Sequence, residues 1–251
     1  MGGEKKGRCP GKAGAMNLTI IGCEYAGKTT LAEGIVEWTN RTAGEGRGFH
    51  DHFAMPNEEL SPESKEHLMA APAQLKEMFQ RFMIAHHMSK DFFIGPDQNF
   101  IGFHIEEAVY AHLYYGYGGE DSGADFRSGT GQRTEMARAV EKELMRLAPD
   151  AAVVLLKARP EVIRQRMRDN PHEHQILRDE DTEHVLTRFE EEYELSLIQN
   201  KFAIDTSDRT PQETLDEFVR RFEPYITEAD RSPTWSEDRK EQIDRAWASY
   251  L

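Results

Sequence analysis

The sequence predicts an α/β fold in which helices cover both faces of a parallel sheet. Short apolar runs alternate with amphipathic segments along the 251 residues, a length that suits one domain. The run at 18–21 is short, largely apolar and β-branched, and the run at 151–156 is apolar throughout, as strands buried on both faces should be. We find no internal repeat. A ligand of such a fold is expected at the carboxyl ends of the strands.

The first apolar run leads into a glycine loop. The segment Gly22-Cys23-Glu24-Tyr25-Ala26-Gly27-Lys28-Thr29 fits the Walker A pattern G-x-x-x-x-G-K-[ST] at every fixed position. We expect a strand at about 17–22 before this loop and a helix at about 28–40 after it. In that context, backbone N–H groups and the positive end of the helix dipole converge on one point, where polyphosphate can bind.

Each residue type in the loop indicates the role of that residue. Gly22 and Gly27 permit the backbone angles that the turn needs. Lys28 is expected to reach the β- and γ-phosphates of ATP, and the Thr29 hydroxyl is expected to ligate Mg²⁺. The predicted nucleotide-binding residues are Gly22, Glu24, Tyr25, Ala26, Gly27, Lys28, Thr29 and Thr30.

A short strand and a long helical block are expected next. Residues 49–53 alternate apolar and polar and predict the second strand. Residues 57–95 predict helix, with a start at Pro62 after the capping residue Ser61. Large side chains recur along one face of this block, namely Leu75, Met78, Phe79, Phe82, Met83 and His86.

The middle of the chain repeats the alternation. We expect a third strand at 100–105 and then a helix rich in tyrosine. The glycine-rich span 116–131 predicts a long loop, and loops of this length are often functional. An amphipathic helix follows the loop, and the apolar run at 151–156 predicts the fourth strand.

The last third contains three predicted helices and one strand. Pro160 opens the first of these helices, and the second is expected at about 181–198. Residues 201–205 predict the fifth strand. Thr210 is expected to cap the last helix, with Pro211 at its first position.

With its strands placed in this way, the chain resembles the P-loop kinases of the thymidylate kinase and deoxynucleoside kinase group over residues 16–225. The resemblance rests on the glycine loop, the Glu106-Glu107 pair, the RQRMR segment at 164–168 and KFAIDTSDRTPQET at 201–214. It implies a three-layer α/β/α P-loop NTPase sandwich, a five-stranded parallel sheet of order 2-3-1-4-5 and a helical lid at about 160–180.

The resemblance also implies catalytic roles. Asp51 matches the acidic residue that orients the acceptor oxygen, although a loop or capping carboxylate is the alternative. Glu106 matches the acidic residue that helps to hold Mg²⁺. Arg164 and Arg168 are the candidates for lid arginines that stabilise the transferring phosphoryl group. Arg164, Arg166 and Arg168 alternate along this helix, so they cannot all share one face: one or two reach the phosphoryl group, or the arginines form a solvated basic face.

The acceptor side departs from the pattern of the group. Glu107 stands where the group usually has an arginine. A second carboxylate would repel a phosphorylated acceptor and favours a neutral one, unless Glu107 faces solvent. The acceptor pocket of the group corresponds to Phe79, Phe82, Tyr110 and Tyr114, which could stack on a base, although a stripe at helical spacing is also typical of core packing.

Composition limits the partners and the compartment. A net charge of −14 argues against a large duplex-DNA interface, and no apolar run is long enough for a membrane helix. The two cysteines, Cys9 and Cys23, fit a reducing compartment such as the cytoplasm. We interpret 1–15 as a disordered leader, and 227–251 as a tail that folds back, pairs with a second subunit or stays loose. A homodimer is an open option.

These features predict a kinase that uses ATP and Mg²⁺ and transfers the γ-phosphoryl group to a nucleoside or nucleotide. A modified base or a hydroxyl group of a nucleic acid is a further option within this interpretation. Two alternatives stay open. One is a small-metabolite kinase of the sugar type, and the other is a nucleotide-binding regulator without acceptor chemistry.

Overall fold

The computed structural model describes residues 17–43, 49–51, 60–88, 99–118, 132–171 and 175–226. The leader expected at 1–15 and the tail expected at 227–251 lie outside these residues, as does most of the predicted loop at 116–131.

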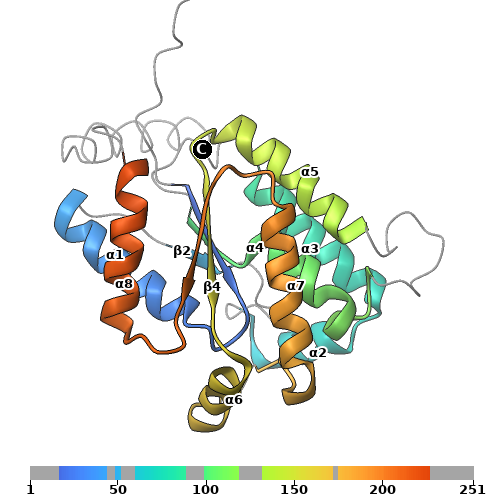
Figure 1. Ribbon diagram of the computed structural model, residues 1–251. Helices are drawn as coiled ribbons and strands as arrows, with labels where there is room; N and C mark the ends of the chain where they lie inside the picture. Colours follow the sequence, from blue (N-terminus) through green and yellow to red (C-terminus); the bar gives the residue numbers. More distant parts are fainter. Residues whose placement is uncertain are drawn as a thin grey trace, which may run out of the picture.

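The described part contains one parallel sheet, with strand order β2-β3-β1-β4-β5 (Figure 1). The strands are β1 (Leu18–Gly22), β2 (Phe49–Asp51), β3 (Asn99–Ile101), β4 (Ala152–Lys157) and β5 (Asn200–Asp205). Every residue of β1 is buried, as expected for a strand covered on both faces. The α/β class and the parallel sheet that the sequence predicts are therefore confirmed.

Helices cover the sheet on both sides, as Figure 1 shows. Helices α1 (Lys28–Ala43) and α8 (Pro211–Phe222) contact each other on one face. On the other face, α4 (Phe103–Tyr110) contacts α5 (Gln132–Leu147) and α7 (Thr182–Leu195). A π-helical turn, η2 (Ala111–Tyr115), continues α4, and short 3₁₀ turns lie at η3 (Asp179–Asp181) and η4 (Glu223–Tyr225).

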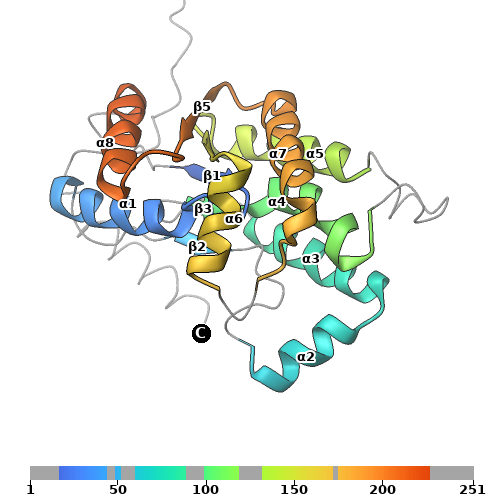
Figure 2. The ribbon, with the colours of Figure 1, turned by 60° about the horizontal axis from the view of Figure 1, so that its bottom comes forward.

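Three helices lie farther out. Helices α2 (Pro62–Ala70) and α3 (Ala73–His87) follow each other, with α3 next to α4 and α2 farther out in the view of Figure 2. Helix α6 (Pro160–Asp169) follows β4 and projects beyond the carboxyl edge of the sheet (Figures 1 and 2). This is the edge at which the phosphate loop also lies, because the loop follows β1.

The predicted helix caps are confirmed. The Ser61 hydroxyl accepts a hydrogen bond from the Ser64 N–H, and Pro62 is the first helical residue of α2. Thr210 and Glu213 form a capping box at the start of α8, which satisfies two N–H groups that lack helical partners.

Three predicted boundaries were wrong. The helical block at 57–95 is interrupted at Pro72, because the residue before a proline is driven to an extended conformation and Ala71 has ψ 150°. The third strand ends at Ile101 rather than at residue 105, because Gly102 with φ 76° turns the chain directly into α4. Helix α7 ends at Leu195, before the predicted end at residue 198.

Candidate functional site

The glycine loop leaves β1 in close contact with β4. Gly22 has φ +150°, and a Cβ atom at this position would lie 2.5 Å from the Leu156 carbonyl oxygen. Any side chain here would push the loop away from the sheet. The Ala26 N–H donates to the Cys23 carbonyl at 3.1 Å and closes the turn, and α1 begins directly afterwards at Lys28. The sequence prediction of a strand, a loop and a helix start is confirmed.

Lys28 is held at the centre of this loop. Its ammonium donates to the carbonyl oxygens of Gly22 at 2.7 Å and Cys23 at 3.2 Å, and its Nζ lies 2.9 Å from Glu106 Oε1. Burial alone would lower the pKa of Lys28, but the charge and hydrogen bond of Glu106 outweigh burial and raise the pKa above its usual value. Lys28 is therefore a fixed positive charge at the mouth of the loop.

Gly102 allows Glu106 to reach Lys28. The Gly102 N–H donates to the Ile20 carbonyl at 2.8 Å, which holds the start of α4 against β1. A Cβ atom on Gly102 would lie 2.3 Å from Glu106 Oε2. The carboxylate therefore occupies the space that a side chain at position 102 would fill. Lys28 and Glu106, which the sequence predicts as site residues, are brought together by this turn.

Tyr110 of α4 also contacts the backbone of the phosphate loop. The Tyr110 hydroxyl accepts a hydrogen bond from the Glu24 N–H at 3.0 Å, and the side chain is only 1% exposed. Burial raises the pKa of Tyr110 well above its usual value. Burial likewise raises the pKa of the neighbouring Cys23 thiol to about 12, so this thiol stays protonated at neutral pH.

The other three predicted pocket residues lie in different settings. Tyr114 lies close, with 5.7 Å between the two ring centroids, and its hydroxyl donates to Asp181 Oδ2 at 3.0 Å. Phe79 is partly buried against the core. Phe82 lies on the outer surface of α3 and is 66% exposed.

Helix α3 exposes part of its predicted apolar stripe. Leu75 is 53% and Met78 65% exposed, whereas Phe79 is partly buried. Its buried residues are Glu77, Gln80 and His87. The most deeply buried side chains of α3 are therefore polar, which the spacing of its apolar residues could not indicate.

Glu107, the carboxylate that follows Glu106, belongs to a buried group of charges between α3, α4 and α5. Glu107 does not face solvent, because it is 2% exposed and pairs with Arg133 of α5 at 2.5 Å. Arg133 also contacts Glu77 at 3.1 Å, and Glu77 lies 2.6 Å from Arg81. Burial raises the pKa of Glu107, although the charge of Arg133 opposes this effect. The solvent-facing alternative for Glu107 is thus wrong.

The arginines of α6 lie in three different settings. Arg166 donates to the Tyr25 carbonyl at 2.9 Å and to the Thr206 carbonyl at 2.7 Å, so it joins the phosphate loop to the end of β5. Arg164 pairs with Asp179 and Glu183, on the side of α7. Arg168 is exposed and donates to the Gln165 side chain at 2.9 Å.

Sequence reasoning selected Arg164 and Arg168, but the structure places Arg166 against the loop. The position of Arg166 in the middle of the RQRMR segment was the available signal. For Arg133 the sequence carries no signal, since its partners come from two other helices.

For three further predicted site residues, the structure gives the backbone position of Asp51 and the exposure of Thr29 and Thr30. The backbone of Asp51 ends β2 in register with Ile101 of β3, at the carboxyl edge of the sheet. Thr29 and Thr30 are exposed in the first turn of α1. Within the described segments no cluster of three His, Cys, Asp or Glu side chains could hold a metal.

The donor set near the loop suits a magnesium ion that is brought in by phosphates. Mg²⁺ prefers oxygen ligands and is usually bound through one or two protein groups together with substrate phosphates. Thr29, which follows Lys28 in the chain, and Glu106, which pairs with Lys28, carry such groups, so these residues fit the ion.

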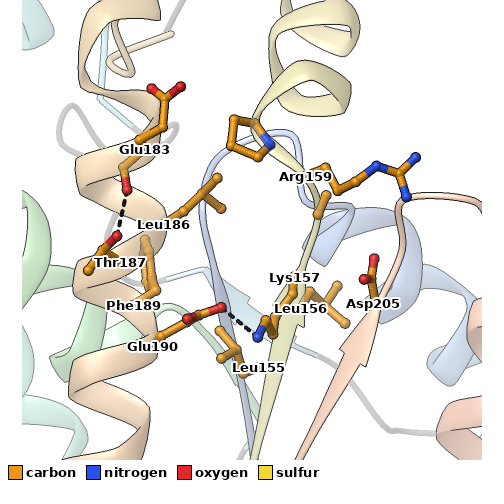
Figure 3. Close-up of a pocket in the computed structure, with 12 residues that line it drawn as sticks. Leu155, Leu156, Lys157, Arg159, Glu183, Leu186, Thr187, Phe189, Glu190 and Asp205 are labelled. Carbon is orange, nitrogen blue, oxygen red and sulfur yellow. Dashed lines mark hydrogen bonds and ion pairs between the residues drawn. The ribbon is translucent and has the colours of Figure 1, made fainter.

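A separate cavity of about 310 Å³ lies beside the loop, at the carboxyl ends of β4 and β5 (Figure 3). Its apolar wall comes from Leu155, Leu186 and Phe189, and the Lys157–Glu190 ion pair borders it. None of its lining residues belongs to the phosphate loop. The cavity is therefore neighbouring space and not the phosphate site itself.

Comparison with known proteins gives matches to solved structures only. No family model and no curated protein matches the chain. A deoxyadenosine kinase from M. mycoides with bound dCTP matches with a TM-score of 0.52 and 14% identity, covering 83% of this chain and 100% of that chain. Thymidylate kinase from Candida albicans matches with a TM-score of 0.52 and 12% identity, covering 84% of this chain and 92% of that one. The chain therefore has a P-loop deoxynucleoside and thymidylate kinase-like fold.

None of the helices within the described ranges is both long enough and apolar enough to cross a bilayer.

Proposed function

We propose that this protein is an ATP- and Mg²⁺-dependent kinase that transfers the γ-phosphoryl group to a nucleoside or nucleotide. The observation that carries the proposal is the Lys28–Glu106 pair, with 2.9 Å between the ammonium and the carboxylate, set in a complete phosphate loop. Such a loop cradles the donor phosphates, and its lysine and the metal ion neutralise the charge that develops on the transferring group.

The proposed division of labour follows the placement of the side chains. Lys28 and the loop amides hold the phosphates, while Thr29 and Glu106 hold the metal. Asp51, at the end of β2, orients the acceptor oxygen. Helix α6 and the residues that follow it, about 160–180, act as a lid that brings arginine to the donor phosphates.

The class of acceptor is supported by the fold and by the charge balance. The matched structures are kinases of nucleosides and nucleotides, one of them with bound dCTP. Because Arg133 neutralises Glu107, the extra carboxylate at position 107 no longer argues against a phosphorylated acceptor. The proposal therefore keeps both nucleosides and nucleoside monophosphates as acceptors.

A phosphoryl-transfer screen tests the proposal. The protein is incubated with Mg²⁺ and γ-labelled ATP, or γ-labelled GTP, and with separate pools of nucleosides, nucleoside monophosphates, sugars and single-stranded DNA. We expect label in a nucleoside or monophosphate pool, and its loss with EDTA and in the Lys28→Ala variant. Lys142→Ala, at an exposed position of α5, is the matched control and should retain transfer.

Two other results would replace the proposal. Label that moves only to the sugar pool would assign a small-metabolite kinase. Binding of ATP that depends on Lys28, without transfer to any pool, would assign a nucleotide-binding regulator.

The acceptor pocket needs a separate pair of variants. Phe79→Ala removes a partly buried ring on the inner side of α3, whereas Phe82→Ala removes an exposed ring on the outer side. If Phe79 contacts the acceptor, its loss raises the acceptor KM and Phe82→Ala does not. An equal effect of the two variants would contradict a pocket on the inner side of α3.

A further inference from the structure

Two variable positions of the phosphate loop bind the segment that follows α6. Glu24 Oε2 accepts hydrogen bonds from the Ile176 N–H at 3.2 Å and the Leu177 N–H at 2.6 Å. The neighbouring Tyr25 hydroxyl donates to Gln175 Oε1 at 2.6 Å. The segment 175–178, which we call the return segment, is therefore attached to the loop by side chains that the phosphate-loop pattern does not require.

Contacts on both sides fix the return segment in this place. The Gln175 side chain donates to the Leu177 carbonyl at 3.0 Å, and Leu177 is buried with 1% exposure. The Arg178 N–H lies 3.4 Å from the Tyr114 hydroxyl, and the Arg178 guanidinium lies over the Tyr114 ring at 5.5 Å. The loop, the π-helical turn after α4 and the return segment thus form one connected surface.

Helix α6 is attached to the same loop through its own arginine. Arg166 donates to the Tyr25 carbonyl, and the Thr206 hydroxyl donates to the Ala26 carbonyl at 3.0 Å. Tyr25 therefore contacts both α6 and the return segment, and the preceding residue Glu24 contacts the return segment.

The charge of Glu24 gives these contacts a physical reason. A carboxylate next to a polyphosphate site is electrostatically unfavourable unless donors compensate its charge. Two backbone N–H groups do so here, and hydrogen bonds to an ionised acceptor are stronger than neutral ones. The backbone N–H of Glu24 also donates to the Tyr110 hydroxyl, which fixes the backbone position from which the Glu24 side chain extends.

We propose that Glu24 is a positioning residue that locks the return segment against the phosphate loop. Together with the contact between Arg166 and the loop, this contact holds α6 beside the donor site before a nucleotide binds. The effect on catalysis rests on the proposed kinase function, whereas the contact itself does not.

Amide hydrogen exchange of the nucleotide-free protein tests the lock directly. In Glu24→Ala the Ile176 and Leu177 amides lose their acceptor, and we expect their exchange to accelerate by about tenfold or more. Glu24→Gln keeps a carbonyl oxygen and should restore part of the protection. Glu33→Ala, at an exposed position of α1, is the matched control and should leave the exchange of 175–178 unchanged.

The outcomes separate this inference from the proposed function. Unchanged exchange at Ile176 and Leu177 in a folded Glu24→Ala protein would overturn the lock, whatever the kinase assay gives. Faster exchange with rescue by Gln supports the lock even if no acceptor is phosphorylated. If Glu24→Ala does not fold, Glu24→Gln takes its place: a neutral carbonyl oxygen accepts more weakly than a carboxylate, so faster exchange at Ile176 and Leu177 than in the wild type is then required.

Discussion

Arg133 and Glu107 are 26 positions apart in the sequence, but Arg133 Nη1 lies 2.5 Å from Glu107 Oε1. Both side chains are almost fully buried, at 3% and 2% exposure. A buried carboxylate without a counterion is strongly destabilising, so this pair is what makes a glutamate tolerable directly after Glu106.

Arg133→Met should destabilise the protein by about 3 kcal/mol, because Glu107 then stays buried without its partner. The pKa of Glu107 is already raised by burial and rises further in the variant. A carboxyl group with a raised pKa in the folded state favours folding at low pH, and this benefit disappears as the pH rises above that pKa. Urea unfolding should therefore show a smaller loss at pH 5 than at pH 8.

The double variant Arg133→Met/Glu107→Gln is the control for this pH dependence. Its stability should be partly restored at pH 8, because no buried charge is left without a partner. An equal loss for the single variant at both pH values would contradict the assignment.

The pair between Lys28 and Glu106 should couple the two residues in stability as well as in activity. Each single variant, Lys28→Ala or Glu106→Gln, leaves one buried charge, so each should lower the free energy of unfolding by about 1–3 kcal/mol. The double variant should lose clearly less than the sum of the two. Additive losses in a urea-denaturation cycle would show that the residues do not interact.

Glu141 should make the protein sensitive to acid. Burial alone would raise the pKa of Glu141, but hydrogen bonds from His104, the Leu197 N–H and the Ser196 hydroxyl outweigh burial and lower it. A lowered folded-state pKa gives stability that is present above pH 4.5 and disappears as the pH falls toward the folded-state pKa. The melting temperature of the wild type should therefore drop more steeply below pH 4.5 than that of Glu141→Gln.

Cys23 should be inert although it lies in the phosphate loop. With its pKa at about 12 and no exposed surface, little thiolate forms at pH 8. In a Cys9→Ser background, alkylation by iodoacetamide should be slower than for a free cysteine by a factor on the order of a thousand. Denaturation should restore the full rate, and rapid labelling of the native protein would contradict the burial of the thiol.

The loop and the order of the elements could be predicted from the sequence because both depend on local patterns. The fixed glycines and lysine of the loop specify a turn and a charge within eight residues of chain. Continuous apolar runs specify buried parallel strands, and Thr210 with Glu213 specifies a helix start. Each of these features depends on residues that are close in the chain, so it can be predicted before the tertiary structure is known.

The faces of helices and the partners of charges were decided only by the tertiary structure. The apolar stripe of α3 predicts a packed face, but the structure turns Phe82 outward and buries Gln80. The buried Glu77 of the same helix meets Arg133 of α5. Glu107 looked like an unmatched charge because its counterion arrives from α5. A helical period fixes which residues share a face, and only the packing of distant segments determines what that face meets.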